Sequence, residues 1–144
     1  MKYISTRGAA LRGVGGLDQP AVPLGELESQ LIEADRVPFT REPLALVITP
    51  TRELAMQVSK ELEWLYANAG ARVVTCVGGM DPLRERRALQ SGTHIVVGTP
   101  GRLRDHLERG ALDQSSLRAV VLDEADEMLD MGFREELEEI LDAT

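Results

Sequence analysis

The sequence predicts an α/β domain in which a parallel β-sheet is covered by helices on both faces. Short apolar segments rich in Val, Ile and Leu alternate with segments whose apolar residues recur at helical spacing. The short segments are continuously apolar, which is typical of parallel strands that are buried on both sides. A chain of 144 residues is long enough for one such domain.

Four segments have the character of buried strands. Each is closed by Gly, Pro or charged residues, and their ranges are 44–50, 71–79, 94–100 and 117–126. In a parallel sheet the carboxyl ends of the strands share one edge, and ligands bind there. The four segments end in TPTRE, GG, TPGR and DEAD. The distinctive polar residues are therefore expected at that single edge.

Four helices are predicted between and after these strands, over residues 54–69, 82–92, 101–110 and 134–143. Pro82 suits the first turn of the second helix, and Gly110 is a suitable terminator for the third. The fourth helix is acidic and amphipathic. Its apolar side consists of Leu137, Ile140 and Leu141, which are expected to face the sheet.

The first 36 residues differ from the rest of the chain. Residues 11–25 are rich in Gly and Pro, which predicts a loop, and residues 26–34 have the spacing of one short helix. We therefore expect an atypical N-terminal segment, residues 1–36, ahead of a domain that spans residues 37–144.

Composition restricts the possible functions. The net charge of −8 argues against a general polyanion-binding surface, so any nucleic-acid contact must be local. Cys76 is the only cysteine, which excludes a disulfide within the chain and fits a reducing compartment. No apolar run reaches membrane-spanning length, and residues 1–10 lack the apolar core of a signal peptide. A cytoplasmic location is expected.

A cluster of carboxylates follows the fourth predicted strand. The apolar run 119–122 ends at Asp123, Glu124 and Asp126, which repel one another unless a cation lies between them. An Asp in this position often holds Mg²⁺ in phosphoryl-transfer proteins, and a neighbouring carboxylate can activate water. The pattern predicts Asp123 as a magnesium ligand that acts through water, and Glu124 as the water-activating group. The alternative is a solvated acidic turn.

Four motifs together resemble a known family. PTREL (50–54), GG (78–79), TPGR (99–102) and DEAD (123–126) occur in the order and spacing found in DEAD-box ATP-dependent RNA helicases. The resemblance covers residues 42–144. It implies an incomplete first RecA-like domain of the P-loop NTPase type, with ATP and Mg²⁺ as cofactors and RNA as partner.

The resemblance also implies roles for individual residues. Asp123 and Glu124 correspond to the residues that bind the cofactor and hydrolyse ATP, and Asp126 to one that links the ATP state to RNA binding. The implied contacts to the RNA backbone are Thr51, Arg52, Gly79, Thr99, Gly101 and Arg102. Contacts of this kind, made where strands become helices, read phosphates and not bases. Binding without sequence preference is therefore expected.

Some of the family's motifs are not recognisable. A P-loop has the pattern G-x-x-x-x-G-K-[ST], but the only lysines are Lys2 and Lys60, and neither follows Gly. The glycines of residues 12–18 lack both the Lys and the hydroxyl. The family's glutamine motif, Ser-Ala-Thr motif and second RecA-like domain are also not found. These features suggest a rearranged, spliced or truncated helicase gene.

Without the neighbouring strands of the family, the predicted strand at 117–123 should expose one edge. That edge would be open to a second RecA-like domain or to another chain. Cover by residues 1–36 is the alternative, although nothing in their pattern predicts it.

Two functions follow from these observations. The first is a partial core of an ATP-dependent RNA helicase that is inactive as this chain alone, and the second is a non-enzymatic RNA-backbone-binding or interaction module. An unstable fragment without function is a third alternative. A transition-metal site at His94 or His106 is not favoured, and Cys76 is expected to pack in the core. A solvated helix surface is expected for Arg84, Arg86 and Arg87.

Overall fold

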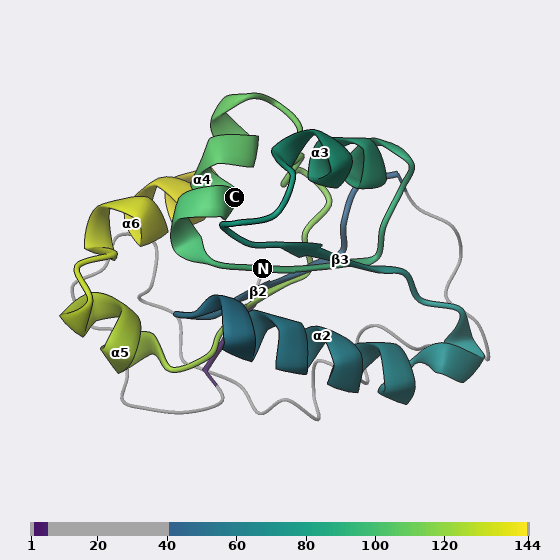
Figure 1. Cartoon of the computed structure of the whole chain (residues 1–144), viewed down its shortest axis with the longest axis horizontal. Coiled ribbons are helices and arrows are strands. Elements are labelled where there is room, and N and C mark those ends of the chain that lie inside the picture. Colours follow the sequence, from purple (N-terminus) through teal and green to yellow (C-terminus); the bar gives the residue numbers. More distant parts are fainter. Residues whose placement is uncertain (1, 6–40, 144) are drawn as a thin grey trace.

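The structure is a computed structural model that describes residues 2–5 and 41–143. Within those ranges the chain forms a five-stranded sheet with helices on both faces (Figure 1). The loop predicted at 11–25 and the short helix predicted at 26–34 lie outside the described residues. The fold class predicted from the alternation of apolar segments is confirmed.

All neighbouring strands are parallel, and their order across the sheet is β1-β5-β2-β4-β3. Ile48 lies opposite both Gly98 and Leu122, and Gly98 lies opposite Cys76. The last residues of these strands are therefore level with one another, and the motifs that follow them leave the sheet at one edge. The strands are β1 (Lys2–Ser5), β2 (Ala45–Ile48), β3 (Val73–Cys76), β4 (Ile95–Gly98) and β5 (Ala119–Leu122).

The four helices predicted between and after the strands are present as α2, α3, α4 and α6, and within the described residues α5 is an additional helix that was not predicted. The predicted strand at 117–126 ends early, because Glu124 adopts a left-handed backbone conformation and α5 begins at Ala125. The helical elements are α2 (Arg52–Leu65), the 3₁₀ turn η1 (Ala67–Ala69), α3 (Pro82–Gln90), α4 (Pro100–Glu108), α5 (Ala125–Asp130) and α6 (Arg134–Asp142).

The strands separate two apolar layers. The even-numbered residues of β2 and β5 pack with buried residues of α3, α4, α5 and α6, while the odd-numbered residues pack with α2. Figure 1 shows α2 below the sheet and α3 and α4 above it. This alternation fixes the register, because a slip of one residue would exchange the two layers.

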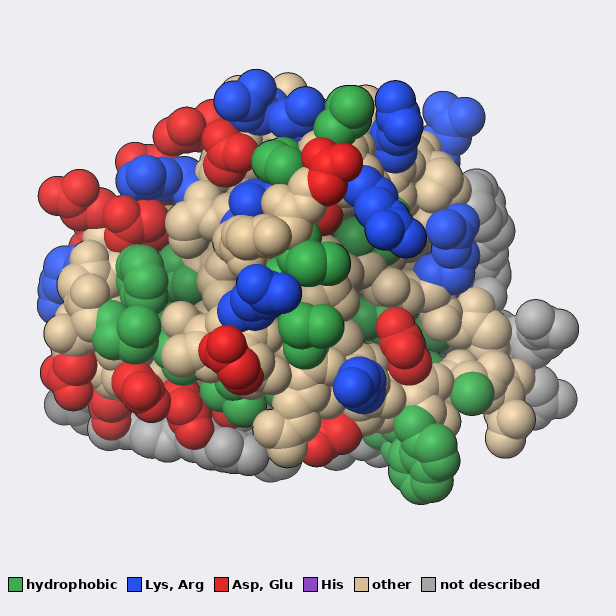
Figure 2. Space-filling view, in the orientation of Figure 1, with side chains coloured by type: hydrophobic (Ala, Val, Ile, Leu, Met, Phe, Trp, Pro, Cys, Tyr) green, Lys and Arg blue, Asp and Glu red, His purple; other side chains and the backbone are tan. Residues whose placement is uncertain are grey.

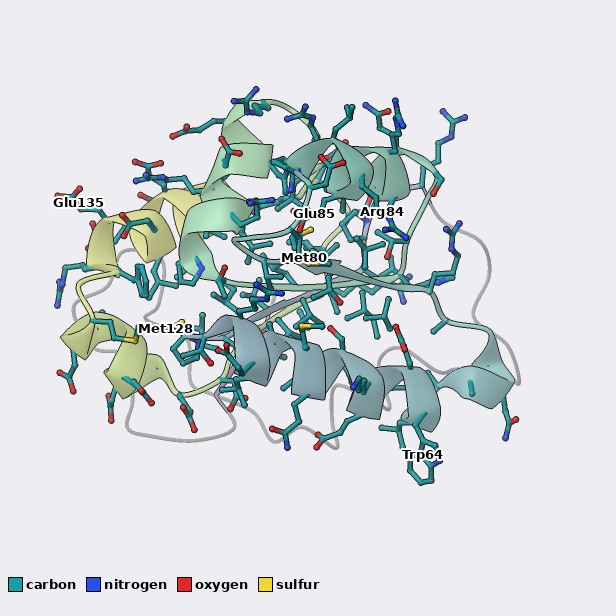
Figure 3. All side chains as sticks on the ribbon, in the orientation of Figure 1. Trp64, Met80, Arg84, Glu85, Met128 and Glu135 are labelled. Carbon is teal, nitrogen blue, oxygen red and sulfur yellow. The ribbon has the colours of Figure 1, made fainter. Side chains whose placement is uncertain are left out.

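The apolar side of α6 faces the core, and the two aromatic residues near the end of α2 differ in burial. Leu137, Ile140 and Leu141 are buried in the layer that includes α6, as the helical spacing predicted. Tyr66 is buried in the layer that includes α2. Trp64 is 81% exposed and points away from the domain (Figure 3), so it takes no part in the core.

The edge of β5 is not open, which corrects the expectation for residues 117–123. β1 pairs with it in parallel, with Lys2 opposite Ala119 and Ser5 opposite Leu122. The N-terminal segment thus supplies the backbone partners of β5 on this side. The outer edge of the sheet on this side belongs to β1.

Charge is unevenly distributed over the surface. Figure 2 shows acidic side chains gathered at the end formed by α5 and α6, and basic side chains toward α3. The exposed acidic residues at that end are Asp126, Glu127, Asp130, Glu135, Glu139 and Asp142. None of the described helices is long and apolar enough to cross a membrane.

Candidate functional site

The loops after β2, β3, β4 and β5 leave the sheet at its carboxyl edge, as the motif order predicted. The loops after β2 and β4 lead directly into α2 and α4, so two helix N-termini lie at this edge. The first N–H groups of a helix have no partner within the helix and carry partial positive charge. The edge therefore offers hydrogen-bond donors suited to phosphate oxygens.

Thr51 and Arg52 begin α2. The hydroxyl of Thr51 caps the helix by accepting a hydrogen bond from the Leu54 N–H at 3.2 Å. Arg52 is exposed and reaches the turn after β3, where its Nη2 donates to Met80 Sδ at 3.8 Å. The side chain thus places positive charge beside the GG motif.

Gly79 has a φ of +83°, which a residue with a side chain rarely adopts. A Cβ atom at Gly79 would lie 2.8 Å from Nη1 of Arg52. The glycine therefore permits both the turn and the close approach of the guanidinium. The structure brings Arg52 and Gly79 together, as the shared sheet edge predicted.

Thr99 and Gly101 lie at the start of α4. Thr99 is the extended residue that precedes the helix, and Pro100 occupies the first turn. Gly101 is exposed, and a Cβ atom there would meet nothing within 4 Å. The backbone at this helix start is therefore open to a ligand.

Arg102 differs from Arg52 because its side chain is only 13% exposed. Its Nη1 donates to Glu85 Oε1 at 2.9 Å, and Nη1 and Nη2 both donate to the Met80 carbonyl at 3.3 Å. The guanidinium thus connects α4 to α3 and to the turn after β3. Figure 3 shows Met80 and Glu85 in this central region of the sheet edge.

The DEAD motif follows β5. The Asp123 N–H still donates to the Ile48 carbonyl at 2.9 Å, and Asp123 is 5% exposed. Glu124 has a φ of 56° and is the only residue other than glycine with positive φ in the described part of the chain. Such backbone costs about 1–2 kcal/mol and is concentrated at functional sites. Beyond this turn Asp126 is exposed at the start of α5.

Glu124 of this motif is close enough to influence the acidic residue that follows the motif. A hydrogen bond with the Glu124 carboxyl, together with its negative charge, raises the pKa of Glu127. Oxygen ligands with excess negative charge suit Mg²⁺, so Asp123 and Glu124 fit the predicted metal in their chemistry. The pattern that would hold nucleotide phosphates is missing from the sequence. The carboxylates of Asp123 and Glu124 therefore fit Mg²⁺, whereas no recognisable motif of the sequence fits the phosphates of ATP.

Sequence reasoning missed the side chain that links the motifs, Glu85 of α3. Glu85 is 6% exposed, and its Oε2 accepts the Val77 N–H at 3.0 Å. Its Oε1 lies 2.8 Å from Nε2 of His106, which is fully buried. The helical spacing of Glu85 and Leu89 was a signal, because residues four apart share one face and Leu89 is buried.

Cys76, Glu85 and His106 have ligand-type atoms within 4.8 Å of one another, and they form the only such group among the described residues. Two features argue against a metal there. Burial, and then the charge of Glu85, raise the pKa of the Cys76 thiol to about 12. The thiol therefore stays protonated at neutral pH, and Arg102 already supplies a cation to Glu85.

Comparison with known proteins agrees with this geometry. The DEAD/DEAH box helicase family model matches residues 29–144. The chain is 55% identical over 97 residues to the DEAD-box ATP-dependent RNA helicase CshA of Geobacillus kaustophilus, covering 67% of this chain and 21% of that protein. It is 45% identical over 135 residues to the ATP-dependent RNA helicase DeaD of Haemophilus influenzae, covering 93% and 21%.

A solved structure has the same fold. The crystal structure of a DEAD box protein from the hyperthermophile Methanococcus jannaschii superimposes with a TM-score of 0.72 at 34% identity, covering 99% of this chain and 36% of that one. The chain spans about a fifth of the length of the two curated relatives. The resemblance carried by PTREL, GG, TPGR and DEAD is confirmed, and the chain belongs to the DEAD/DEAH box helicase family.

Proposed function

We propose that this chain is the RNA-backbone-binding part of an incomplete first RecA-like domain of an ATP-dependent RNA helicase. One observation carries the proposal: the N-termini of α2 and α4, with Arg52 against Gly79, meet at one sheet edge. The contacts are assigned to Thr51, Arg52, Gly79, Thr99, Gly101 and Arg102.

The chemistry of this edge favours phosphates over bases. The Gly101 N–H in the first turn of α4 and the exposed guanidinium of Arg52 suit phosphate oxygens. Contacts of this kind position a nucleic acid without reading its sequence. The net charge of −8 is compatible, because the acidic residues gather at the α5–α6 end.

Binding of a fluorescein-labelled oligouridylate, followed by anisotropy over a range of salt concentrations, tests this proposal. We expect binding without ATP, and Arg52→Ala should weaken it at least about tenfold, since a charge-assisted hydrogen bond contributes about 1.5–3 kcal/mol. The slope of log K against log salt should fall by about 0.7, the value for one phosphate contact on a single strand.

Arg118→Ala is the matched control. Arg118 is exposed and precedes β5, at the opposite end of the strands from the motifs. Its removal changes the net charge as Arg52→Ala does, but it should leave the salt slope unchanged. Equal losses in the two variants would mean that binding reflects overall charge, and would contradict a site at the carboxyl edge.

A second part of the proposal concerns ATP. In the family the cofactors are ATP and Mg²⁺, and we assign the metal to Asp123 and the activation of water to Glu124, with Asp126 linking the nucleotide and RNA sites. Bound Mg²⁺ would neutralise phosphate charge. Because this chain has no P-loop pattern, we propose that it does not hydrolyse ATP appreciably on its own.

Phosphate release in the presence of RNA, ATP and Mg²⁺ tests this expectation. The chain and its Glu124→Gln variant should give the same background rate. Turnover by the unmodified chain that Glu124→Gln abolishes would show that the carboxylates work with another phosphate site. A second RecA-like domain, as in the intact family, is the partner we would expect to complete the reaction.

The alternative is a non-enzymatic RNA-backbone-binding or interaction module. RNA affinity that is the same with and without ATP and Mg²⁺ would favour this module. Affinity that rises with nucleotide would favour a helicase core that retains its coupling.

A further inference from the structure

We infer that Glu85 is a positioning residue of the RNA-binding edge, which holds the turn after β3 in place through Arg102. The inference rests on the proposed function, because it assigns a role within that same edge. Glu85 lies on α3, outside the four motifs. It is nevertheless the point at which the turn after β3 and helix α4 are both connected to α3.

The contacts of Glu85 form a clamp, defined here as Glu85, Arg102, His106 and the backbone of Val77 and Met80. Oε2 accepts the Val77 N–H at 3.0 Å, and Oε1 accepts from Arg102 Nη1 at 2.9 Å and lies 2.8 Å from His106 Nε2. Arg102 in turn donates to the Met80 carbonyl at 3.3 Å. Both ends of the Gly78–Gly79 turn are thereby fixed.

The chemistry of the clamp requires a carboxylate. Both oxygens of Glu85 accept hydrogen bonds, and a side-chain amide has only one oxygen. Gln in this position would point its NH₂ group at the Val77 N–H or at the Arg102 guanidinium, and both of these are donors. Glutamine would therefore preserve the shape of the clamp and lose one of its acceptors.

The clamp also determines what Arg102 can do. With 13% of its side chain exposed and its donors directed at Glu85 and Met80, Arg102 supports the turn from within. Arg52 approaches the same turn from the exposed side, where its Nη2 reaches Met80 Sδ. The two arginines thus differ: Arg52 meets the ligand from the exposed side, and Arg102, in addition to its proposed RNA contact, orders the turn that the ligand meets.

Simple electrostatics and positioning predict opposite results for the removal of Glu85. A carboxylate near a polyanion site weakens binding by repulsion, so Glu85→Ala or Glu85→Gln would strengthen RNA binding if charge alone mattered. If Glu85 positions the turn, the same variants weaken binding. A residue that contributes only to folding would leave affinity unchanged well below the melting temperature.

The test measures oligouridylate affinity of the full chain and its variants at a temperature where circular dichroism shows each to be folded. We expect Glu85→Ala to bind about tenfold more weakly, the effect of one charge-assisted contact of about 1.4 kcal/mol. Glu85→Gln should fall between wild type and Glu85→Ala. The matched control, Glu63→Gln, removes one charge from an exposed position of α2 and should bind RNA no more weakly than wild type.

A double-mutant cycle tests whether Glu85 acts through Arg102. Arg102→Ala should cause a smaller loss in the Glu85→Ala background than in wild type, because both changes break the same clamp, whereas Arg52→Ala should keep its full effect. Hydrogen exchange gives a second readout without RNA: the Val77 amide should exchange about tenfold faster in Glu85→Ala.

Folding of the variants is expected to survive the change. A hollow of about 410 Å³ is lined by Glu85, Met80 and Arg84, so the space left by a shorter side chain at residue 85 is continuous with it. If Glu85→Ala does not fold, Glu85→Gln still decides between weaker and stronger binding, because it keeps the side-chain volume.

Each outcome has a distinct meaning. Wild-type chain that does not bind RNA overturns the proposed function and this role of Glu85 together. Wild-type binding with unchanged or tighter binding in both folded Glu85 variants overturns the inference alone. Tighter binding would show that Glu85 withholds Arg102 from RNA instead of using it to order the turn.

Discussion

Burial controls the chemistry of Cys76. The side chain ends β3, is fully buried and belongs to the apolar layer beside α3 and α4. Loss of hydration, and then the negative charge of Glu85, raise the pKa of the thiol from 9.0 to about 12, while Arg102 opposes the shift. This residue was expected to pack in the core, and its position confirms that expectation.

The raised pKa predicts a dependence of stability on alkaline pH. Below pH 9 the thiol is protonated in the folded and the unfolded chain. Between pH 9 and about 12 the unfolded chain loses this proton and the folded chain keeps it, so stability falls as pH rises. The slope contributed by Cys76 is at most about 1.4 kcal/mol per pH unit.

Urea unfolding of the wild type and Cys76→Ala, measured between pH 8 and pH 11 (about the range in which an ordinary thiol titrates), isolates this effect. The difference in unfolding free energy between the two proteins should shrink with rising pH. A difference that stays constant would mean that the thiol is ionised in the folded chain as readily as in the unfolded one.

Individual residues also show where sequence reasoning reaches its limit. Arg52 and Gly79 were placed at one edge because their motifs follow parallel strands, and a pattern of strands is visible in the sequence. Glu85 was missed, because an acidic residue on a polar helix normally faces water. Its role depends on three partners, Arg102 and His106 on α4 and the Val77 N–H in the turn after β3. The helical spacing with Leu89 indicates burial of Glu85 but does not show these contacts.

At the scale of elements, the helices at the carboxyl edge depend on their first residues. α2 begins after Thr51, whose hydroxyl accepts the Leu54 N–H. α3 begins in the same way, since the Asp81 carboxylate accepts the Leu83 N–H at 3.0 Å. α4 has no side-chain cap of this kind from Thr99. The start of α4 is therefore stabilised by Pro100 and by tertiary contacts.

Thr51→Ala should lower the free energy of unfolding by about 1 kcal/mol, because the Leu54 N–H loses its acceptor at the helix start. Thr51→Ser keeps the hydroxyl and should remain within a few tenths of a kcal/mol of wild type. Urea unfolding of the three proteins measures both changes. Equal losses for Ala and Ser would assign the effect to the methyl group of Thr51 and not to the cap.

Strands and long helices were predictable, because apolar residues at fixed spacing must face a core. The short helix α5 was not predicted, since the only sequence signal at that position was a charged motif at the end of a strand. Glu124 adopts a conformation that is unusual for a residue with a side chain, and this turn ends β5 before the motif is complete. At Glu124 the backbone conformation follows the geometry of the turn and not the usual preference of a residue with a side chain.

At the scale of the whole molecule, β1 completes the sheet with a segment from the opposite end of the chain. Its four residues pair in parallel with β5. The prediction of an exposed edge at residues 117–123 was wrong, because sequence patterns show which segments are strands but not how distant segments pair. A strand of four residues gives a weak signal by itself.

Removal of residues 1–6 should expose the backbone of β5 and cause the chain to self-associate through that edge. Sedimentation velocity at several concentrations would detect the association, and the melting temperature should fall because the ladder hydrogen bonds of β1 are lost. A truncated chain that remains monomeric with an unchanged melting temperature would show that β1 does not protect the edge.

The separation of charge between the α5–α6 end and the basic side chains toward α3 has a consequence for how a ligand arrives. A polyanion such as RNA repels the acidic end and attracts the basic region. The domain is therefore oriented, as RNA approaches, with its basic region toward the RNA. Encounters would therefore begin preferentially with Arg52 and the GG turn facing the nucleic acid. Added salt would weaken this alignment and slow association, even though the net charge of the chain is negative.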